Sequence, residues 1–280
     1  LSSVMHTETP TPVPPKTQGQ WRIRLWDEND QPGAWSEAVF ETGLPFADWQ
    51  GVWVCPETEE PDIDCTDAIN AFAKPNWEQK QAALEASGKG TAQPYQPHRP
   101  ASYLRKVFTA PAGEGKRLYI TAKGLYTVWL NGKRVGDMVL APGSFTADKH
   151  LGVQTYDVTA LVRDGENELL IALGDGWYRS TSGVDGDRDL FGKEVAVLFQ
   201  LEVDGKAVCV SDSSMEATQR GPIRQNDLQQ GEVYDARLEG TLSGWHDVKT
   251  KPNTLPITGM NTVPIREQES FEGKLFRTPN

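Results

Sequence analysis

Residues 116–132 have the sequence KRLYITAKGLYTVWLNG. Apolar residues alternate with polar ones along much of it, Gly124 interrupts the pattern, and Asn131-Gly132 ends it. Alternation with a period of two is typical of β-strands. Asn-Gly favours a tight hairpin because both central residues of a type I′ turn need positive φ. The stretch therefore predicts strands at 116–123 and 125–131, with a hairpin turn after the second.

Further strands of the same kind are predicted at 103–109, 155–158, 168–174, 194–203 and 207–211. Asp164-Gly165 and Asp204-Gly205 separate some of these strands and favour tight turns in the same way. Many short strands with little helix are typical of sandwiches and jelly rolls. We therefore predict an all-β fold, an antiparallel jelly-roll-like β-sandwich.

The flanking segments have a different character. Residues 1–20 are rich in Thr and Pro, as is typical of a linker. A hairpin is predicted for 21–26 and 38–42, and it must pack on the following domain or on strands that precede this chain, because a lone hairpin is marginally stable. Residues 57–100 combine helix formers with prolines and predict a small, partly helical insertion. Residues 246–280 are again rich in Pro and Thr and predict a connector.

The composition excludes several classes of partner. The 280 residues include 28 Lys and Arg against 39 Asp and Glu, a net charge of −11. This charge repels phosphate backbones and anionic lipids, so we expect no nucleic-acid partner. No run approaches the roughly 20 apolar residues that span a bilayer, and no signal peptide is visible. We expect no membrane partner and a cytoplasmic rather than a secreted protein.

The cysteines and histidines offer no catalytic pattern. Cys55, Cys65 and Cys209 are odd in number, which favours unpaired thiols in a reducing compartment, although Cys55 and Cys65 could pair if the protein were exported. The four histidines lie in tail, loop or linker segments. There is no Gly-x-Ser-x-Gly elbow, dinucleotide fingerprint or Walker A sequence. We predict no catalytic residue in this chain.

Residues 174–192 combine aromatic and acidic side chains in a turn-rich loop. Asp185, Asp187 and Asp189 alternate in a spacing that lets oxygen ligands converge on Ca²⁺, but such a run is more often a solvated acidic loop with turn-type hydrogen bonds. Trp177, Tyr178 and Trp129 could stack on a sugar ring or belong to the core.

Several runs resemble the bacterial α-L-rhamnosidases of glycoside hydrolase family 78. WRIRLWD (21–27) and FETGL (40–44) resemble the end of that family's fibronectin-type, Ig-like N-terminal domain. The family's accessory β-sandwich is matched, in consecutive order, by YLRKVF (103–108), GLYTVWLNGKRVGD (124–137), LAPG (140–143), QTYDVT (154–159), LGDGWYR (173–179), GPIR (221–224) and GEVYDAR (231–237).

The resemblance implies a division of the chain. Residues 1–46 would be a linker and the remnant of the fibronectin-type domain, and 47–245 the accessory β-sandwich with its insertion at 57–100. Residues 246–280 would connect to a further β-domain and to a catalytic (α/α)₆ barrel that these 280 residues do not contain. The chain would therefore be an N-terminal fragment without the catalytic carboxylates.

The resemblance also implies a function and partners. The parent enzyme would hydrolyse terminal α-L-rhamnose from glycosides, and this segment would either scaffold the barrel or bind rhamnose. The alternative is a Ca²⁺-dependent carbohydrate-binding module that acts independently of the barrel, as in some family members. The order of the loops gives Asp148, Trp177, Tyr178 and Arg179 as sugar-binding candidates. The metal candidates for Ca²⁺ remain Asp185, Asp187 and Asp189.

Overall fold

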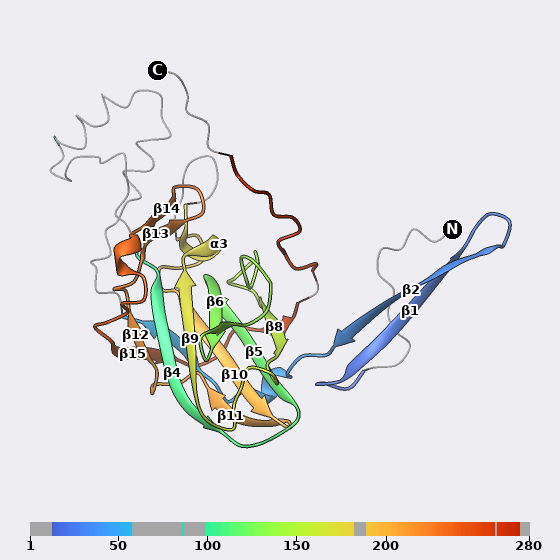
Figure 1. Ribbon diagram of the computed structural model, residues 1–280, viewed down its shortest axis with the longest axis horizontal. Coiled ribbons are helices and arrows are strands. Elements are labelled where there is room, and N and C mark those ends of the chain that lie inside the picture. Colours follow the sequence, from blue (N-terminus) through green and yellow to red (C-terminus); the bar gives the residue numbers. More distant parts are fainter. Residues whose placement is uncertain (1–12, 58–85, 87–98, 182–188, 261, 275–280) are drawn as a thin grey trace.

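A computed structural model describes residues 13–57, 86, 99–181, 189–260 and 262–274. Its main body is a curled sheet in the order β16-β8-β5-β10-β3-β15-β12-β4-β9-β6-β7, with β11 paired to β10 (Figure 1). Its strands are β3 (Trp53–Pro56), β4 (Ser102–Ala110), β5 (Lys116–Lys123), β6 (Leu125–Leu130), β7 (Lys133–Arg134), β8 (Leu151–Asp157), β9 (Gly165–Gly174), β10 (Ala196–Val203), β11 (Lys206–Val210), β12 (Glu216–Thr218), β15 (His246–Lys251) and β16 (Ile257–Gly259).

The described strand pairs of this sheet are antiparallel, except that β16 runs parallel to β8. Smaller elements complete the described chain: β1 (Gln18–Trp26), β2 (Pro32–Glu41), β13 (Ile223–Asp227), β14 (Gly231–Tyr234), the helix α3 (Gly176–Arg179) and the 3₁₀ turns η1 (Phe46–Asp48) and η2 (Ala236–Leu238). The predicted all-β, sandwich-like fold is confirmed.

The curled sheet encloses one main core. The strands β8, β5, β10 and β3 lie on one side of it and β4, β9 and β6 on the other, and β15 and β12 link the two along the sheet. Ile120 of β5, Phe199 of β10 and Ile171 of β9 belong to the same buried cluster, each with no exposed surface. Each such side chain contributes about 1.5–3 kcal/mol through burial, so the facing of these strands is the main source of stability.

The stretch 116–132 crosses from one side of the core to the other. Its two predicted strands are β5 and β6, and Gly124 between them has φ +115°, where a Cβ would collide with the carbonyl oxygen of Gly174. Asn131 and Gly132 have φ of 52° and 77° and join β6 to β7 as an antiparallel hairpin. The predicted strands and hairpin are therefore confirmed.

The two other Asx-Gly turns differ in outcome. Asp204-Gly205 joins β10 to β11 as a hairpin, as predicted. Asp164-Gly165 lies at the start of β9, but β9 pairs with β4 and β6 while the preceding β8 pairs with β5. This turn is held instead by Asn167, whose Oδ1 accepts a hydrogen bond from the Arg163 amide at 2.8 Å and whose Nδ2 donates to two carbonyl oxygens. Local turn chemistry therefore did not determine which strands pair.

The segment after residue 245 differs from the predicted connector. Its residues 246–251 form β15, which pairs with β3 on one side and β12 on the other, and β16 adds to the edge of the sheet beside β8. β15 has the sequence HDVKTK, in which Val248 packs against the main core. With one apolar residue, the strand carries too little alternation for sequence patterning to reveal it.

The hairpin β1–β2 projects away from the curled sheet (Figure 1). Two ion pairs tie its base to the sheet: Lys16 Nζ to Glu202 Oε1 at 2.8 Å and Arg117 Nε to Glu41 Oε1 at 3.0 Å. The hairpin predicted from 21–26 and 38–42 is thus present and longer than expected. The predicted insertion at 57–100 lies, apart from its margins, outside the described residues.

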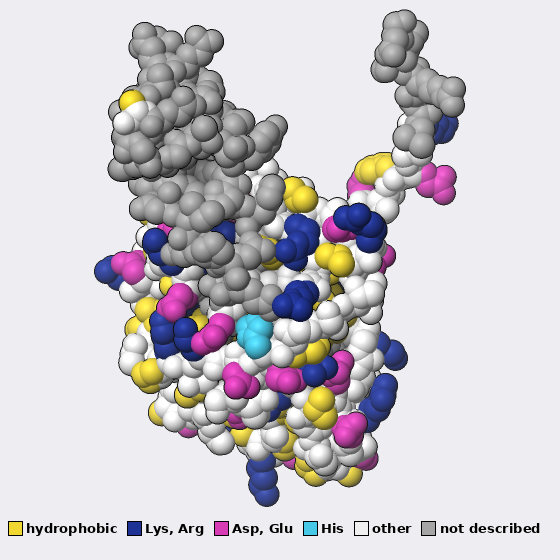
Figure 2. All heavy atoms as spheres, turned by 90° about the vertical axis from the view of Figure 1, so that its left-hand side faces the viewer, with side chains coloured by type: hydrophobic (Ala, Val, Ile, Leu, Met, Phe, Trp, Pro, Cys, Tyr) yellow, Lys and Arg dark blue, Asp and Glu magenta, His cyan; other side chains and the backbone are white. Residues whose placement is uncertain are grey.

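The face shown in Figure 2 carries charges of both signs, and the described cysteines are buried. Acidic and basic side chains are interspersed over the face shown in Figure 2. Cys55 and Cys209 are buried and free, whereas Cys65 lies outside the described residues. Burial raises the pKa of the Cys209 thiol to about 12. None of the helices within the described ranges has the length and apolarity needed to cross a membrane.

Candidate functional site

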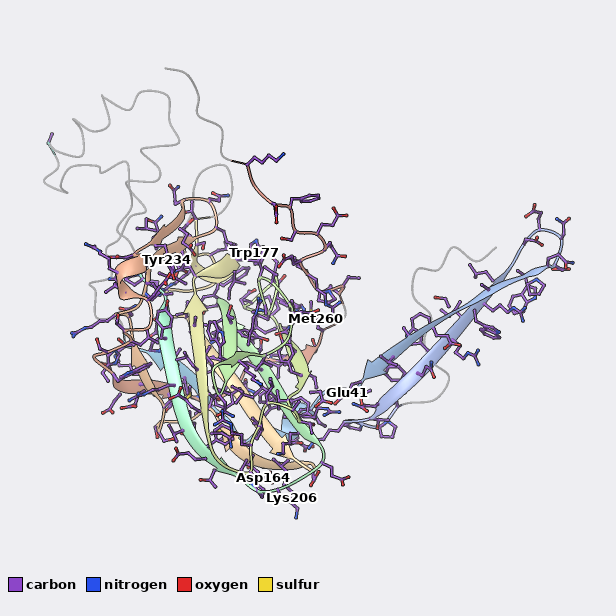
Figure 3. The ribbon with its side chains drawn as sticks, in the orientation of Figure 1. Glu41, Asp164, Trp177, Lys206, Tyr234 and Met260 are labelled. Atoms are coloured by element: carbon purple, nitrogen blue, oxygen red, sulfur yellow. The ribbon has the colours of Figure 1, made fainter. Side chains whose placement is uncertain are left out.

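The short helix α3 follows β9 and carries three of the predicted sugar-binding residues, Trp177, Tyr178 and Arg179. Gly176 begins this single turn with φ 55°, and a Cβ there would lie 2.5 Å from Cγ of Leu125. Glycine is therefore required for the chain to leave the strand so close to β6. Trp177 and Tyr178 are half-buried, and Trp177 lies at the end of the sandwich that also carries Tyr234 (Figure 3).

Arg179 holds α3 in place. Its side chain is 3% exposed, and Nε donates to Oδ1 of Asp175 at 2.5 Å, while Nη1 donates to the carbonyl oxygen of Lys193 at 3.1 Å. The guanidinium thus joins the end of β9 to the segment before β10. The sequence grouped Arg179 with Trp177 and Tyr178 as a sugar contact, but the structure directs it into the protein.

A cavity of about 390 Å³ lies beside the start of α3. Apolar side chains of Leu125, Leu173 and Ile223 line part of it. Arg134 and Glu232 also line it and supply charged groups. A concave site with an apolar lining and a few polar groups is the usual form of a small-molecule pocket.

Asn226 and Asp227 line part of this cavity, and sequence reasoning missed both. Asn226 Oδ1 accepts from the Asp175 amide at 2.5 Å, and its Nδ2 donates to the Arg99 carbonyl oxygen at 3.0 Å. Asp227 Oδ2 accepts from both the amide and the hydroxyl of Thr181, at 2.7 and 2.9 Å.

The Asp227 carboxylate also organises the turn that follows β13. Its Oδ1 accepts from the amides of Gln229 and Gln230, each at 2.9 Å. Burial by itself would raise the pKa of Asp227, but the hydrogen bonds from Thr181, Gln230 and Gln229 outweigh it and lower the pKa below its ordinary value. An Asp two residues before polar residues in a turn-rich run is a typical Asx-turn pattern and is the signal that could have identified it.

A second cavity, of about 370 Å³, lies at the other end of α3. Tyr178 lines it together with Cys55, Lys123, Glu194 and Lys251, and Gly192 and Lys193 complete the lining. The ring of Tyr178 packs 6.4 Å from that of Phe191, and a Cβ on Gly192 would lie 2.6 Å from the Tyr178 hydroxyl. Burial raises the pKa of Tyr178.

The predicted metal residues are only partly described. Asp185 and Asp187 lie outside the described residues. Asp189 is described, and its two carboxylate oxygens accept from Nη1 and Nη2 of Arg99 at 2.6 and 3.3 Å. Among the described residues, no group of three or more His, Cys, Asp or Glu side chains is arranged to hold a metal ion. The Ca²⁺ site stays a prediction.

The remaining candidates lie apart. Asp148 is exposed and forms an ion pair at 3.0 Å with its neighbour Lys149. Nearby Ala147 is in the same apolar cluster as Tyr178, so the structure brings the 148 loop and α3 onto one cluster without directing the Asp148 carboxylate into either cavity. Trp129 is half-buried and packs against the small cluster of Ala101, Tyr103 and Ala172.

Two family models match this chain. The family model described as the α-L-rhamnosidase N-terminal domain matches residues 114–275, more than half of the chain. The chain belongs to this family. A second family model, the Rha78A-like N-terminal immunoglobulin domain, matches residues 2–45 and accounts for the hairpin β1–β2. The region matched by the first model includes β15 and β16, for which the sequence predicts a connector.

Relatives and solved structures agree with the family assignment. An α-L-rhamnosidase of Formosa agariphila is 34% identical over 267 residues, covering 91% of this chain and 26% of the relative. One from Streptomyces avermitilis is 42% identical over 150 residues, covering 52% of this chain and 14% of the relative. The chain thus spans about a quarter or less of these curated relatives.

The fold matches solved rhamnosidases over nearly the whole chain. The native α-L-rhamnosidase of Aspergillus terreus superposes with a TM-score of 0.67 at 27% identity, covering 91% of this chain and 28% of that one. The Streptomyces avermitilis α-L-rhamnosidase complexed with L-rhamnose has a TM-score of 0.69 at 23% identity, with coverage of 92% and 40%, and shares the fold.

Proposed function

We propose that this chain is the N-terminal part of an enzyme that hydrolyses terminal α-L-rhamnose from glycosides, and that its role is to scaffold the catalytic barrel. The curated relatives are named α-L-rhamnosidases, and they are about four times as long as the matched region or longer. The catalytic carboxylates would lie in the region of the enzyme beyond these 280 residues. The substrates would be rhamnose-containing glycosides.

The observation that supports scaffolding is an apolar segment held on the surface of the sandwich. Val263, Ile265 and Phe271 are 88%, 48% and 82% exposed. The segment is nevertheless anchored, since the Val139 amide donates to the Ile265 carbonyl oxygen at 2.8 Å and Arg266 pairs with Asp137 at 2.8 Å. Large apolar side chains presented from a fixed position are typical of surfaces that contact another domain.

The test compares the full-length enzyme with a variant in which Val263 and Phe271 are both replaced by Ser. We expect the replacement to lower the melting temperature of the catalytic domain and the yield of active enzyme, with little change in KM for an aryl rhamnoside. Val107→Ser is the matched control, because Val107 lies on β4, is 57% exposed and does not belong to the segment. Unchanged stability of the double variant would contradict scaffolding through this segment. Turnover of the aryl rhamnoside by the 280-residue chain alone would contradict the assignment of catalysis to the rest of the enzyme.

Rhamnose binding is the second candidate, and the cavity beside Gly176 favours it. The cavity has about 390 Å³, within the range of small-ligand pockets, and its apolar lining suits the C–H face of a deoxy sugar. Arg134 and Glu232 could take the sugar hydroxyls. Calorimetric titration of the chain with L-rhamnose, with and without Ca²⁺, tests both the sugar and the metal. Heat that is lost in Glu232→Ala supports the site, and absence of heat at millimolar sugar leaves scaffolding alone.

A further inference from the structure

The cavity at the Tyr178 end of α3 brings together residues from three strands, β3, β5 and β15, and from the segment just before β10. Lys123 is the last residue of β5 and pairs across the sheet with Ala196 of β10, just after Glu194. Lys251 is the last residue of β15 and pairs with Trp53 of β3. The strand order β5-β10-β3-β15 therefore gathers these side chains at one end of the sheet. Residues that are 128 positions apart, 251 − 123, form one wall.

The charge of this cavity opposes that of the chain. Three of its lining residues are lysines, Lys123, Lys193 and Lys251, and one is a glutamate, Glu194. The lining therefore carries a formal charge of 3 − 1 = +2, whereas the chain carries −11. Lys251 Nζ is hydrogen-bonded to Glu194 Oε2, so this pair is neutral, and Lys123 adds a further cation to the cavity wall. A positive pocket on a negative protein concentrates anions.

Lys123 is the central cation. Its side chain is half-buried and its Nζ lies 5.0 Å from the centroid of the Trp53 ring. In the described parts of the chain, no carboxylate or carbonyl oxygen is hydrogen-bonded to this ammonium group. Burial lowers the pKa of Lys123, which means that its charged form lacks the solvation it would have in water. A bound anion would restore that stabilisation.

Tyr178 adds a neutral donor to the lining of the same cavity. Its ring forms part of the cavity wall, and its hydroxyl approaches Gly192, where a side chain would fill the space. Burial also raises the pKa of Cys55, so its thiol stays protonated. Glu194 is the acidic side chain of the lining. The other polar side chains of the lining can donate hydrogen bonds, because they are ammonium groups, a phenol and a thiol.

We propose that this cavity binds a carboxylate group, held by the ammonium of Lys123 and the hydroxyl of Tyr178. The volume of about 370 Å³ exceeds what a single small ion fills and suits a ligand of the size of a sugar acid or a small carboxylic acid. The site is separate from the activity proposed above, so its failure would leave that proposal intact.

The experiment titrates the chain with glucuronate, acetate, sulfate and glucose, monitored by calorimetry at low ionic strength. We expect glucuronate to bind and glucose, which has the same ring without the charge, not to bind. Tighter binding of glucuronate than of acetate identifies a sugar acid as the source of the carboxylate, and equal binding identifies a small carboxylic acid. Sulfate that binds as tightly as glucuronate would overturn the carboxylate assignment.

Variants assign the binding to Lys123. In Lys123→Met, which keeps the aliphatic stem on Trp53, we expect glucuronate affinity to fall by about tenfold or more. Lys249→Met is the matched control, because Lys249 lies on β15, is 64% exposed, pairs with Glu57 and does not line the cavity. It removes the same charge and should change the affinity less than about twofold. Tyr178→Phe should weaken binding without removing it.

Comparing these variants separates binding in this cavity from a general effect of net charge. Lys123→Arg, which preserves the charge, should retain measurable binding even if Lys123→Met proves unstable by circular dichroism. Equal loss in Lys249→Met and Lys123→Met would mean that net charge and not this cavity governs the effect, and would overturn the proposal. So would the absence of glucuronate binding to the unmodified chain.

Discussion

The hairpin β1–β2 and the curled sheet are built from the same kind of alternating strand but differ in what covers them. In the hairpin, Trp21, Leu25 and Val39 are 42%, 75% and 82% exposed. In the sheet, Leu118, Phe199 and Ile171 are fully buried. A period of two tells which side chains share a face of a strand, but only a facing layer turns that face into a core.

The difference also appears in how each region is held together. The hairpin relies on cross-strand pairs such as Arg22 with Glu37 at 2.7 Å and on guanidinium stacking, with Arg22 4.9 Å and Arg24 5.4 Å from the Trp35 ring centroid. Exposed interactions of this kind contribute a few tenths of a kcal/mol to about 1 kcal/mol each. The hairpin is therefore a weakly stabilised extension, and the sheet is the cooperative unit.

The largest expected effect is in the core of the sheet. Phe199→Ala removes a fully buried ring from β10. We expect it to lower the free energy of unfolding by about 3–5 kcal/mol, because it removes burial and leaves a cavity. Urea denaturation followed by far-UV circular dichroism measures the change. A loss below about 1 kcal/mol would mean that the sheet is no more cooperative than the hairpin.

The next largest effect is expected at the buried ion pair of Arg179 and Asp175. Arg179→Met leaves Asp175 without its guanidinium partner, where the two side chains are 3% and 1% exposed. We expect a loss of about 3 kcal/mol, because a buried carboxylate loses its guanidinium counter-charge. Arg237→Met is the control, since Arg237 is 88% exposed in its pair with Asp235 and its loss should change stability far less than the loss of Arg179. Similar losses in both variants would contradict the role assigned to burial.

The pH dependence of the free energy of unfolding tests the role of the Asp227 carboxylate. Its pKa in the folded protein is lowered, so near its ordinary value of about 3.9 the unfolded chain binds more protons than the folded one. The stability that this carboxylate contributes is complete above that value and is lost as the pH falls through the folded pKa. We expect Asp227→Asn to lose about 1–2 kcal/mol at pH 7 and less at pH 3. Chemical denaturation at both pH values measures it, and a loss that is independent of pH would contradict the assignment.

The smallest effect should be in the hairpin. Trp35→Ala removes the ring on which two guanidinium groups stack. We expect the global unfolding free energy to change by less than about 0.5 kcal/mol, because surface substitutions away from a core rarely do more. Amide hydrogen exchange should nevertheless lose protection in β1 and β2 alone. A fall in the stability of the whole sheet would show that the hairpin belongs to its cooperative unit.

The candidate site shows where sequence reasoning succeeds and where it stops. The aromatic and glycine pattern at 174–179 correctly indicated a turn at a strand end, because Gly176 is dictated by local geometry. It could not tell that Arg179 points inward, because Asp175 and the Lys193 carbonyl oxygen meet it only after folding. Asn226 and Asp227 were missed because their partners, Asp175 and Thr181, lie about 50 positions away in the chain.

By itself, the sequence of this protein determined many of its strands, its tight turns and the family it resembles. Those features depend on neighbouring residues, whose periodicity and allowed backbone angles are properties of a short segment. Tertiary structure alone decided that β15, with one apolar residue, joins β3 to β12 and that lysines 128 positions apart share one cavity. Strand order and side-chain convergence depend on which surfaces are buried against each other, and that free energy is a property of the whole fold.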